Sequence, residues 1–310
     1  MSIEVISPGL LTTVQDAGRI GQRHVGVGSA GAADAFSLAV ANLLVGNPMD
    51  AAALEITLAG PTLRFARATR IALCGGMFEA SIDGLPYPGQ RAARLPAGAT
   101  LSIGPCRQGC RAYLAVAGGI DVPRLMGSRS TDLRAGFGGH AGRALRRGDH
   151  LPVVGGAAHR GPLQIDPRWM NLLPDLDPDP MRPLRVLPGR DACAPPNALF
   201  TQPWTVTAAS NRQGCRLSGR PLVLSDPGER VSEPVTPGTI QLPPDGQPIV
   251  LMAEAQTVGG YPRIGHVIDA DLPRLAQRRP GDRMVFAPID EAGAEAAAAA
   301  QAHRLARMAI

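Results

Sequence analysis

Short apolar runs separated by glycine and proline recur along most of the chain. Runs of about four to eight residues bounded by turn residues are typical of β-strands. They lie at Leu10–Gln15, Leu54–Leu58, Thr69–Leu73, Thr100–Ile103 and Arg111–Val116, and again at Leu184–Leu187, Trp204–Thr207, Thr239–Leu242, Ile249–Met252 and Met284–Ala287. With 37 glycines and 30 prolines, the chain has ample turn residues between them. The pattern predicts a mainly β fold with few short helices.

Two segments follow a helical pattern instead. Asp34 is a suitable N-cap for a helix over Ala35–Val45, whose apolar residues fall mostly on one face, and Gly46 before Asn47-Pro48 ends it. The tail Glu291–Ile310 is rich in alanine, with Glu early and Arg late, which matches the helix dipole. We expect the tail to form a peripheral C-terminal helix.

The length of 310 residues exceeds the usual domain size of about 100–200 residues, which indicates two domains. A stretch rich in glycine, proline and aspartate separates the two sets of strands. We therefore expect a first barrel domain over residues 1–158, a linker or mobile loop over 159–182, a second barrel domain over 183–290 and the C-terminal helix over 291–310.

The two predicted domains share a weak internal repeat. Leu54–Leu58 corresponds to Gly238–Leu242 at an offset of 184 positions, and Gly75-Gly76 corresponds to Gly259-Gly260 at the same offset. We interpret this spacing as a diverged duplication of one β unit. Two copies of a sheet could protect their edges by closing into barrels, and a ligand site between the halves is the default expectation.

Composition excludes several kinds of chemistry. All 31 basic residues are arginine, so no lysine can form a Schiff base, hold a P-loop phosphate or carry biotin. The net charge of +5 suits an anionic substrate or an acidic partner, but aromatic residues are only 4% of the chain. Nucleic-acid binding is therefore not expected, because few side chains could stack on bases.

Cysteine spacing and hydropathy bear on the compartment. The five cysteines (Cys74, Cys106, Cys110, Cys193 and Cys215) are odd in number and widely spaced, unlike a disulfide framework. No CxxC or HExxH motif is present, so we expect no metal site. With neither an apolar membrane span nor a signal-peptide pattern at the N-terminus, the chain is expected to be cytoplasmic.

One segment carries a family resemblance. Gln256-Thr257-Val258-Gly259-Gly260-Tyr261-Pro262 is close to the QTxGGYP signature of the KipA family, also called allophanate hydrolase subunit 2 or the biotin-dependent carboxyltransferase-like family. Thr12–Arg19 and Ala117–Pro123 resemble its opening and middle, so the similarity runs over roughly residues 6–286. The chain departs from the pattern at Asn211–Cys215, usually Asp-Arg-x-Gly-Tyr, and at Glu254-Ala255, usually Asp-Arg. The resemblance implies a pair of cyclophilin-like β-barrels.

The family includes C subunits of bacterial ATP-dependent 5-oxoprolinase. The resemblance therefore implies a subunit that works with a KipI-like B subunit and an A subunit to open 5-oxo-L-proline to L-glutamate. ATP would be used by the complex, and neither metal nor biotin would be attached to this chain. Two alternatives stay open: a biotin-dependent carboxyltransferase of the urea carboxylase type, and a non-catalytic, KipA-like regulatory binding protein.

Candidate site residues are polar, glycine or arginine residues inside the matching motifs. Gln256 and Tyr261 are the predicted catalytic residues. The predicted substrate-binding residues are Thr257, Gly259, Gly260, Arg19, Arg212, Gly118 and Gly119. Glycines would let backbone N–H groups approach a carboxylate or phosphate, and arginines could clamp a carboxylate. Turns that need glycine and arginines in ion pairs are the structural alternatives for these positions, and Asp16, Glu55 and Glu254 are weaker acid–base candidates.

Overall fold

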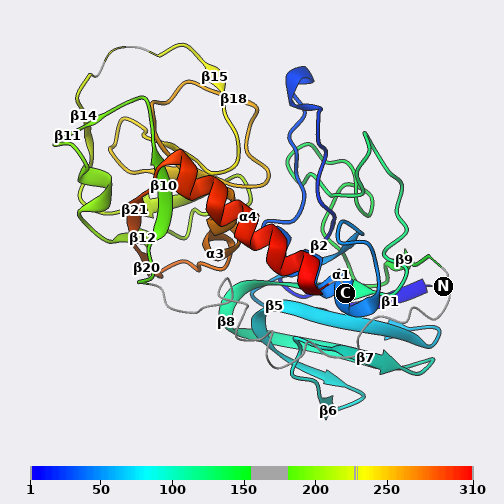
Figure 1. Cartoon of the computed structure of the whole chain (residues 1–310). Coiled ribbons are helices and arrows are strands. Elements are labelled where there is room, and N and C mark those ends of the chain that lie inside the picture. The colour runs from blue at the N-terminus through cyan, green and yellow to red at the C-terminus, as the bar shows by residue number, and fades with distance from the viewer. Residues whose placement is uncertain (1, 155–180, 227, 229, 309–310) are drawn as a thin grey trace. The chain divides into compact units, whose positions relative to one another are not determined.

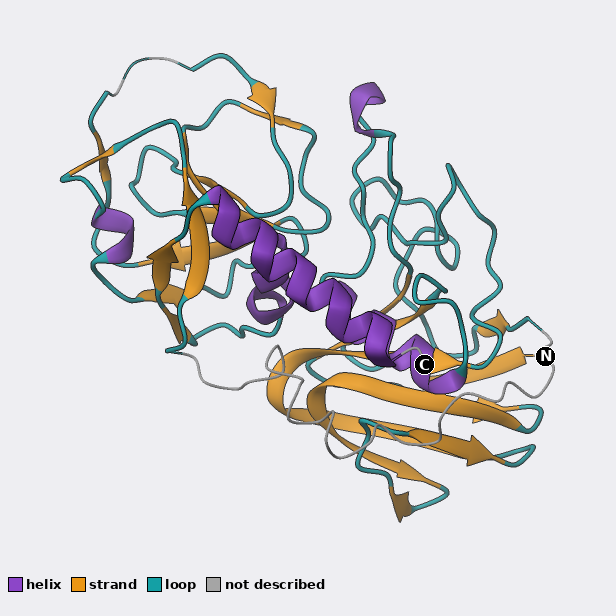
Figure 2. Ribbon diagram, viewed as in Figure 1, coloured by secondary structure: helices purple, strands orange, loops and turns teal. Residues whose placement is uncertain are grey.

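The computed structural model describes residues 2–154, 181–226, 228 and 230–308. Within them the chain is mainly β with three α-helices (Figures 1 and 2). Its two large sheets curve as a half-barrel and a nearly closed barrel. These features confirm the predicted fold class. The predicted linker, apart from Met181 and Arg182, lies outside the described residues.

The chain divides into two compact units. Unit 1 comprises residues 1–19, 30–176 and 304–310, and unit 2 comprises residues 20–29 and 177–303. The assignment of residues 20–29 to unit 2 has no counterpart in the boundaries expected from the sequence. No helix in the described residues is long and apolar enough to cross a membrane.

Unit 1 is built on a nine-stranded sheet. Its main path runs β2-β3-β8-β4-β1-β9, and β5 pairs with β6, β7 and β8. The strands are β1 Ser2–Ser7, β2 Leu11–Gln15, β3 Ala53–Thr57, β4 Thr62–Phe65, β5 Thr69–Ile82, β6 Leu85–Pro86, β7 Ala92–Leu95, β8 Thr100–Val116 and β9 His150–Pro152. Strand β8 joins two segments that were expected to be separate strands. Strand β8 continues through the glycines that were expected to end it, because it stays paired with β5 across several register shifts.

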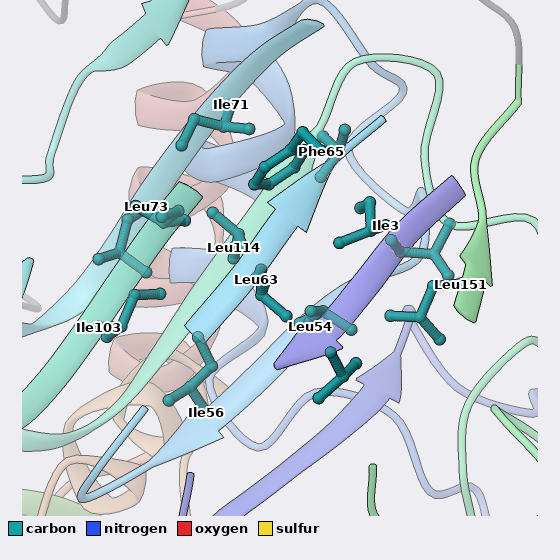
Figure 3. Close-up of a cluster of buried hydrophobic side chains, with 14 of the residues drawn as sticks. Ile3, Leu54, Ile56, Leu63, Phe65, Ile71, Leu73, Ile103, Leu114 and Leu151 are labelled. Atoms are coloured by element: carbon teal, nitrogen blue, oxygen red, sulfur yellow. The ribbon is translucent and has the colours of Figure 1, made fainter. Parts of the chain in front are cut away.

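The two faces of this sheet bury different clusters because side chains alternate along each strand. Leu54 and Leu114 contribute to the larger apolar cluster, part of which Figure 3 shows. Their neighbours Ala53 and Tyr113 belong to the cluster that packs with helix α1, Ala35–Val45. Burial of both faces accounts for the near-continuous apolar character of these strands.

Helix α1 has the predicted bounds. The Asp34 side chain accepts a hydrogen bond from the Ser37 backbone N–H at 2.8 Å, and Gly46 ends the helix at φ 79°. The tail forms the predicted helix, α4, Glu291–Met308. Its residues Leu305 and Met308 pack against the same apolar cluster as α1.

Unit 2 is built on an eight-stranded sheet in the order β20-β12-β13-β17-β16-β19-β10-β21. Its strands are β10 Leu184–Pro188, β12 Trp204–Val206, β13 Gly214–Ser218, β16 Thr239–Gln241, β17 Ile249–Leu251, β19 Arg263–Val267, β20 Arg283–Met284 and β21 Phe286–Pro288. Two short ribbons, β11 Cys193–Ala194 with β14 Val223–Leu224 and β15 Glu233–Pro234 with β18 Val258–Gly259, complete the pairing. Helix α3, Leu272–Ala276, follows β19.

The repeat expected from the sequence matches strands with strands but not the order of the two sheets. The offset of 184 positions relates β3 to β16 and the end of β4 to the start of β17. In unit 1, β3 and β4 flank β8, whereas β16 and β17 of unit 2 pair directly with each other. The duplication therefore stays an interpretation of the sequence spacing.

Candidate functional site

The signature segment Gln256–Pro262 lies at the edge of unit 2, where β18 pairs with β15. The Val235 backbone N–H donates to the Thr257 carbonyl at 3.0 Å and extends this ribbon by one step. Gln256 and Thr257 are half-buried, and Tyr261 is 48% exposed. The segment therefore presents polar groups to solvent from a backbone held by strand pairing.

The two glycines of the signature are not turn residues. Neither Gly259 nor Gly260 is among the residues with positive φ. A β-carbon on Gly259 would lie 2.5 Å from Nε2 of Gln241, closer than real β-carbons approach any neighbour. Gly259 thus makes room for a buried side chain, a role that the sequence did not indicate.

Gln241 ends strand β16 and lies beneath the signature segment. Its side chain is 1% exposed, and its Oε1 accepts a hydrogen bond from Nε2 of Gln256 at 3.2 Å. Its own Nε2 is buried and has no hydrogen-bond acceptor among the described residues. A buried donor without an acceptor is uncommon, because burial strips the amide of water without replacing the lost hydrogen bond.

Arg23 contacts the same segment from a distant part of the chain. It begins a short 3-10 helix, Arg23–Val25, and its Nη2 donates to the backbone carbonyls of Val235 and Gln256, the latter at 2.9 Å. Its Nη1 is buried without an acceptor among the described residues. Desolvation by burial lowers the pKa of the Arg23 guanidinium below its ordinary value. The charge is therefore only partly compensated.

Ion pairs hold the ribbon in place. Arg263 pairs with the Glu233 carboxylate, and Arg190 contacts the same carboxylate at 3.0 Å. Asp191 accepts from the Arg263 backbone N–H at 2.7 Å and from Nε of Arg230 at 3.0 Å. These contacts tie β15 and the segment before it to the start of β19, the strand that follows the signature segment.

Arg212, a predicted substrate-binding residue, forms an ion pair within unit 2. Its Nε donates to Oε1 of Glu254 at 2.7 Å, and both side chains are 4% exposed. The Glu254 backbone N–H donates to the Arg212 carbonyl at 2.8 Å. This pair occupies the two positions near which the chain departs from the family pattern, and it joins the start of β13 to the segment before Gln256.

The other predicted ligands belong to unit 1 and are held there by internal contacts. Arg19 is fully buried, donates to the Ser130 carbonyl and lies 4.5 Å from the centre of the Phe137 ring. The Gly118 N–H donates to Oδ1 of Asn47 at 2.8 Å, and the Gly119 N–H donates to the Val116 carbonyl at 2.8 Å. Both glycines have positive φ, as the turn interpretation expects.

The weaker acid–base candidates of unit 1 are also enclosed by protein donors. Asp16 accepts from the Ser128 hydroxyl at 2.5 Å and the Ser130 hydroxyl at 2.6 Å. Glu55 accepts from the Tyr113 hydroxyl at 2.7 Å and the Ala33 backbone N–H at 2.9 Å. Burial and the nearby Glu55 carboxylate raise the pKa of the Tyr113 phenol well above its ordinary value. Both carboxylates therefore link separate segments of unit 1 through hydrogen bonds.

The structure places Arg23 and Gln241 in contact with Gln256, and Thr257, Gly259, Gly260 and Tyr261 follow Gln256 along the chain. Together these groups present a cation, two amides and two hydroxyls, which bind oxygen atoms of a ligand. In the described residues no group of three or more His, Cys, Asp or Glu side chains is placed to hold a metal ion. Sequence reasoning missed Arg23 because it lies outside the motifs, and Gln241 because it ends an ordinary strand.

Comparisons with known proteins identify the family. The model of the carboxyltransferase domain, subdomains A and B, matches residues 25–288. The C subunit of the Escherichia coli (strain K12) 5-oxoprolinase is 43% identical over 284 residues, covering 89% of this chain and 87% of that protein. The C subunit of the Haemophilus influenzae 5-oxoprolinase is 36% identical and covers 93% of this chain and 91% of that protein.

A solved structure agrees with this assignment. The K. lactis urea amidolyase superposes with a TM-score of 0.89 at 30% identity, covering 99% of this chain and 20% of that one. The chain belongs to the carboxyltransferase domain, subdomain A and B, family. This confirms the resemblance that the signature and its neighbouring motifs indicated.

Proposed function

We propose that this chain is the C subunit of an ATP-dependent 5-oxoprolinase. The observation that carries the proposal is end-to-end similarity to a protein of that name, 43% identical over 89% of this chain and 87% of the relative. The urea amidolyase relationship is of a different kind, because this chain corresponds to about a fifth of that much longer protein. Similar length favours a subunit of the same complex.

The chemical task explains why such a subunit needs a donor-rich site. The lactam carbonyl of 5-oxo-L-proline is a poor electrophile, and phosphorylation of its oxygen by ATP makes it easier for water to attack. ADP leaves in that step, and when water attacks, the electron pair of the C=N bond moves to the ring nitrogen. The nitrogen takes up a proton and the C–N bond breaks, which leaves an acyl phosphate. A second water hydrolyses this acyl phosphate to L-glutamate and phosphate, and N–H and O–H donors stabilise the negative charge that builds up on oxygen in that attack. In the proposed complex, Gln256 and Tyr261 take part in this step, and Thr257, Gly259 and Gly260 shape the substrate site.

The complex would contain a KipI-like B subunit and an A subunit, and it would work in the cytoplasm. ATP enters as a substrate of the whole complex, and this chain carries neither metal nor biotin. The buried Arg212–Glu254 pair would support the fold of unit 2, and the buried Arg19 that of unit 1. The proposal thus gives the signature segment of unit 2 the leading part in substrate binding.

A carboxyltransferase of the urea carboxylase type is the second candidate. The match to the carboxyltransferase domain model and the superposition on urea amidolyase favour it. Because the chain contains no lysine, biotin would have to be carried by another polypeptide. A non-catalytic, KipA-like regulatory role is the third candidate, and it would require binding without turnover.

The test is ATP-dependent release of L-glutamate from 5-oxo-L-proline by the chain reconstituted with its B-like and A-like partners. Each subunit is omitted in turn. We expect activity with all three and its loss when this chain is left out. Activity that is indifferent to this chain would overturn the proposal, and carboxyl transfer from carboxybiotin to urea in a parallel assay would favour the second candidate.

A further inference from the structure

Two residues that each have one buried N–H donor without an acceptor among the described residues, Arg23 and Gln241, contact Gln256 of the signature through their other atoms. Arg23 reaches the backbone carbonyl of Gln256, and Gln241 accepts from the side chain of Gln256. Each of the two keeps one nitrogen, Nη1 of Arg23 and Nε2 of Gln241, that is buried without an acceptor among the described residues. The two nitrogens, one cationic and one neutral, therefore belong to residues that both hold Gln256.

Arg23 differs from two other arginines of the same unit. Arg212 is matched by the Glu254 carboxylate and Arg230 by the Asp191 carboxylate. Arg23, by contrast, meets only backbone carbonyls in the contacts that the structure shows. Buried donors are nearly always paired, and a guanidinium is best paired by a carboxylate. Because backbone carbonyls compensate the Arg23 charge only in part, an anionic oxygen ligand is its natural partner.

We propose that Arg23 and Gln241 form the binding site for the carboxylate of the substrate, with Gln256 as its movable cover. The cover is suited to this role because Gln256 is half-buried and its side chain is held to Gln241 by a single 3.2 Å hydrogen bond. A charge-assisted hydrogen bond to a carboxylate is stronger than such a neutral one. Turning the Gln256 side chain aside breaks this hydrogen bond and frees the Gln241 amide to reorient toward a ligand.

This inference rests on the proposed function for the identity of the ligand, which would be 5-oxo-L-proline. A carboxyl group carried on biotin would present the same chemistry. The experiment measures binding by calorimetry, to the full chain and to the reconstituted complex. Its probes are 5-oxo-L-proline, pyrrolidin-2-one, which has the lactam without the carboxylate, and N1-carboxybiotin.

The decisive variant is Q241E. Glutamate has the same shape, keeps an oxygen that can accept from Gln256, and replaces the unpaired donor by a negatively charged oxygen that repels a carboxylate. We expect Q241E and R23Q to weaken binding of 5-oxo-L-proline at least tenfold and to leave the weak binding of pyrrolidin-2-one unchanged. R283Q removes an exposed arginine of the same unit and serves as the matched control.

Because Arg23 also holds backbone carbonyls, R23Q alone could act through the fold. Q241E and thermal unfolding of both variants separate the two effects. Unchanged binding in a folded Q241E protein, or binding of pyrrolidin-2-one as tight as that of 5-oxo-L-proline, would overturn the inference. Absence of carboxylate binding by both the chain and the complex would overturn it as well.

The results that would overturn the 5-oxoprolinase assignment differ from those that would overturn the carboxylate site. If N1-carboxybiotin binds in a manner that depends on Gln241 while 5-oxo-L-proline does not, the carboxylate site stands and the 5-oxoprolinase assignment falls. If glutamate is released by the complex but Q241E leaves both binding and the KM for 5-oxo-L-proline unchanged, the assignment stands and the site is wrong.

Discussion

Gly259 and Gln241 are fitted to each other: the space that a β-carbon on Gly259 would fill is occupied by the Gln241 amide, at 2.5 Å. The glycine belongs to the signature, whereas the glutamine ends a strand 18 positions earlier. The Gln241 amide also accepts a hydrogen bond from Gln256. Glycine at position 259 therefore leaves room both for the Gln241 amide and for its hydrogen bond with Gln256.

We expect G259A to destabilise the chain by about 1–3 kcal/mol, because the overlapping Gln241 amide is buried and has to move. The alanine methyl group would displace the Gln241 side chain and break its hydrogen bond with Gln256. The free energy of unfolding, measured with urea, gives the cost, and binding of 5-oxo-L-proline should weaken in parallel.

The double variant G259A/Q241A supplies the control. Removing the glutamine amide relieves the overlap, so the two changes should be coupled by about 0.5–3 kcal/mol, as is usual for residues in contact. Strictly additive effects would show that the overlap with Gln241 is not what requires glycine at this position.

The buried pair Arg212–Glu254 predicts a large asymmetry between single and double substitutions. R212A or E254A removes one member of a buried ion pair and should cost about 3–5 kcal/mol of unfolding free energy. Replacement of both by apolar residues, as in R212M/E254L, should cost clearly less, because neither charge then has to be desolvated. Urea unfolding of the three variants tests this.

R283A, at an exposed arginine of the same unit, should change stability by no more than about 0.5 kcal/mol. If single substitutions in the buried pair were equally harmless, Arg212 would be available to a ligand. It would then regain the substrate-binding role that the sequence suggested.

Local patterns predicted the elements whose causes are local. Helix α1 has the predicted bounds because Asp34 caps its first turn and Gly46 adopts the left-handed conformation after its last. Strand β8 was divided in the prediction because Gly104-Pro105 and Gly109 resemble turns. Pairing with β5 keeps β8 continuous through these residues, and the sequence of β8 alone does not indicate this pairing.

The candidate site was predictable only where a motif marked it. Gln256 and Tyr261 stand inside the signature, so the resemblance identified them. Arg23 meets Gln256 across 233 positions of sequence and has no local pattern of its own. Gln241 looked like one polar residue at the end of a strand, and its burial follows from the tertiary position of β18 above it.

Gln256 and Tyr261 should affect turnover more than stability. Both side chains are at least partly exposed, so Q256A and Y261F should each change the free energy of unfolding by less than about 1 kcal/mol. In the reconstituted complex we expect each variant to lower kcat for 5-oxo-L-proline about tenfold or more, because both groups are proposed to act in the chemical step.

The matched control for Tyr261 is Y87F, because Tyr87 belongs to the buried core of unit 1. It should reduce stability and leave turnover of the folded complex unchanged. Full activity in both Q256A and Y261F would remove the signature segment from the catalytic step.

Asp149 should make stability depend on pH in the acid range. Its carboxylate accepts from Nη1 and Nη2 of Arg143 at 2.7 and 2.8 Å and from the Arg146 backbone N–H at 2.7 Å. The Arg143 hydrogen bonds, more than any other contact, hold its pKa far below the ordinary value. A depressed pKa stabilises the fold above the unfolded-state value, about 3.9, and this stabilisation is lost as the pH falls further.

D149N should therefore cost about 1.5–3 kcal/mol at pH 7, typical of hydrogen bonds to a charged group. The difference between the native protein and D149N should shrink as the pH falls below about 4, because protonation removes the same charge from the native protein. Urea unfolding between pH 7 and pH 2 measures it, with D50N at an exposed aspartate as the control. A difference that stays constant over this range would show that the carboxylate charge of Asp149 does not stabilise unit 1.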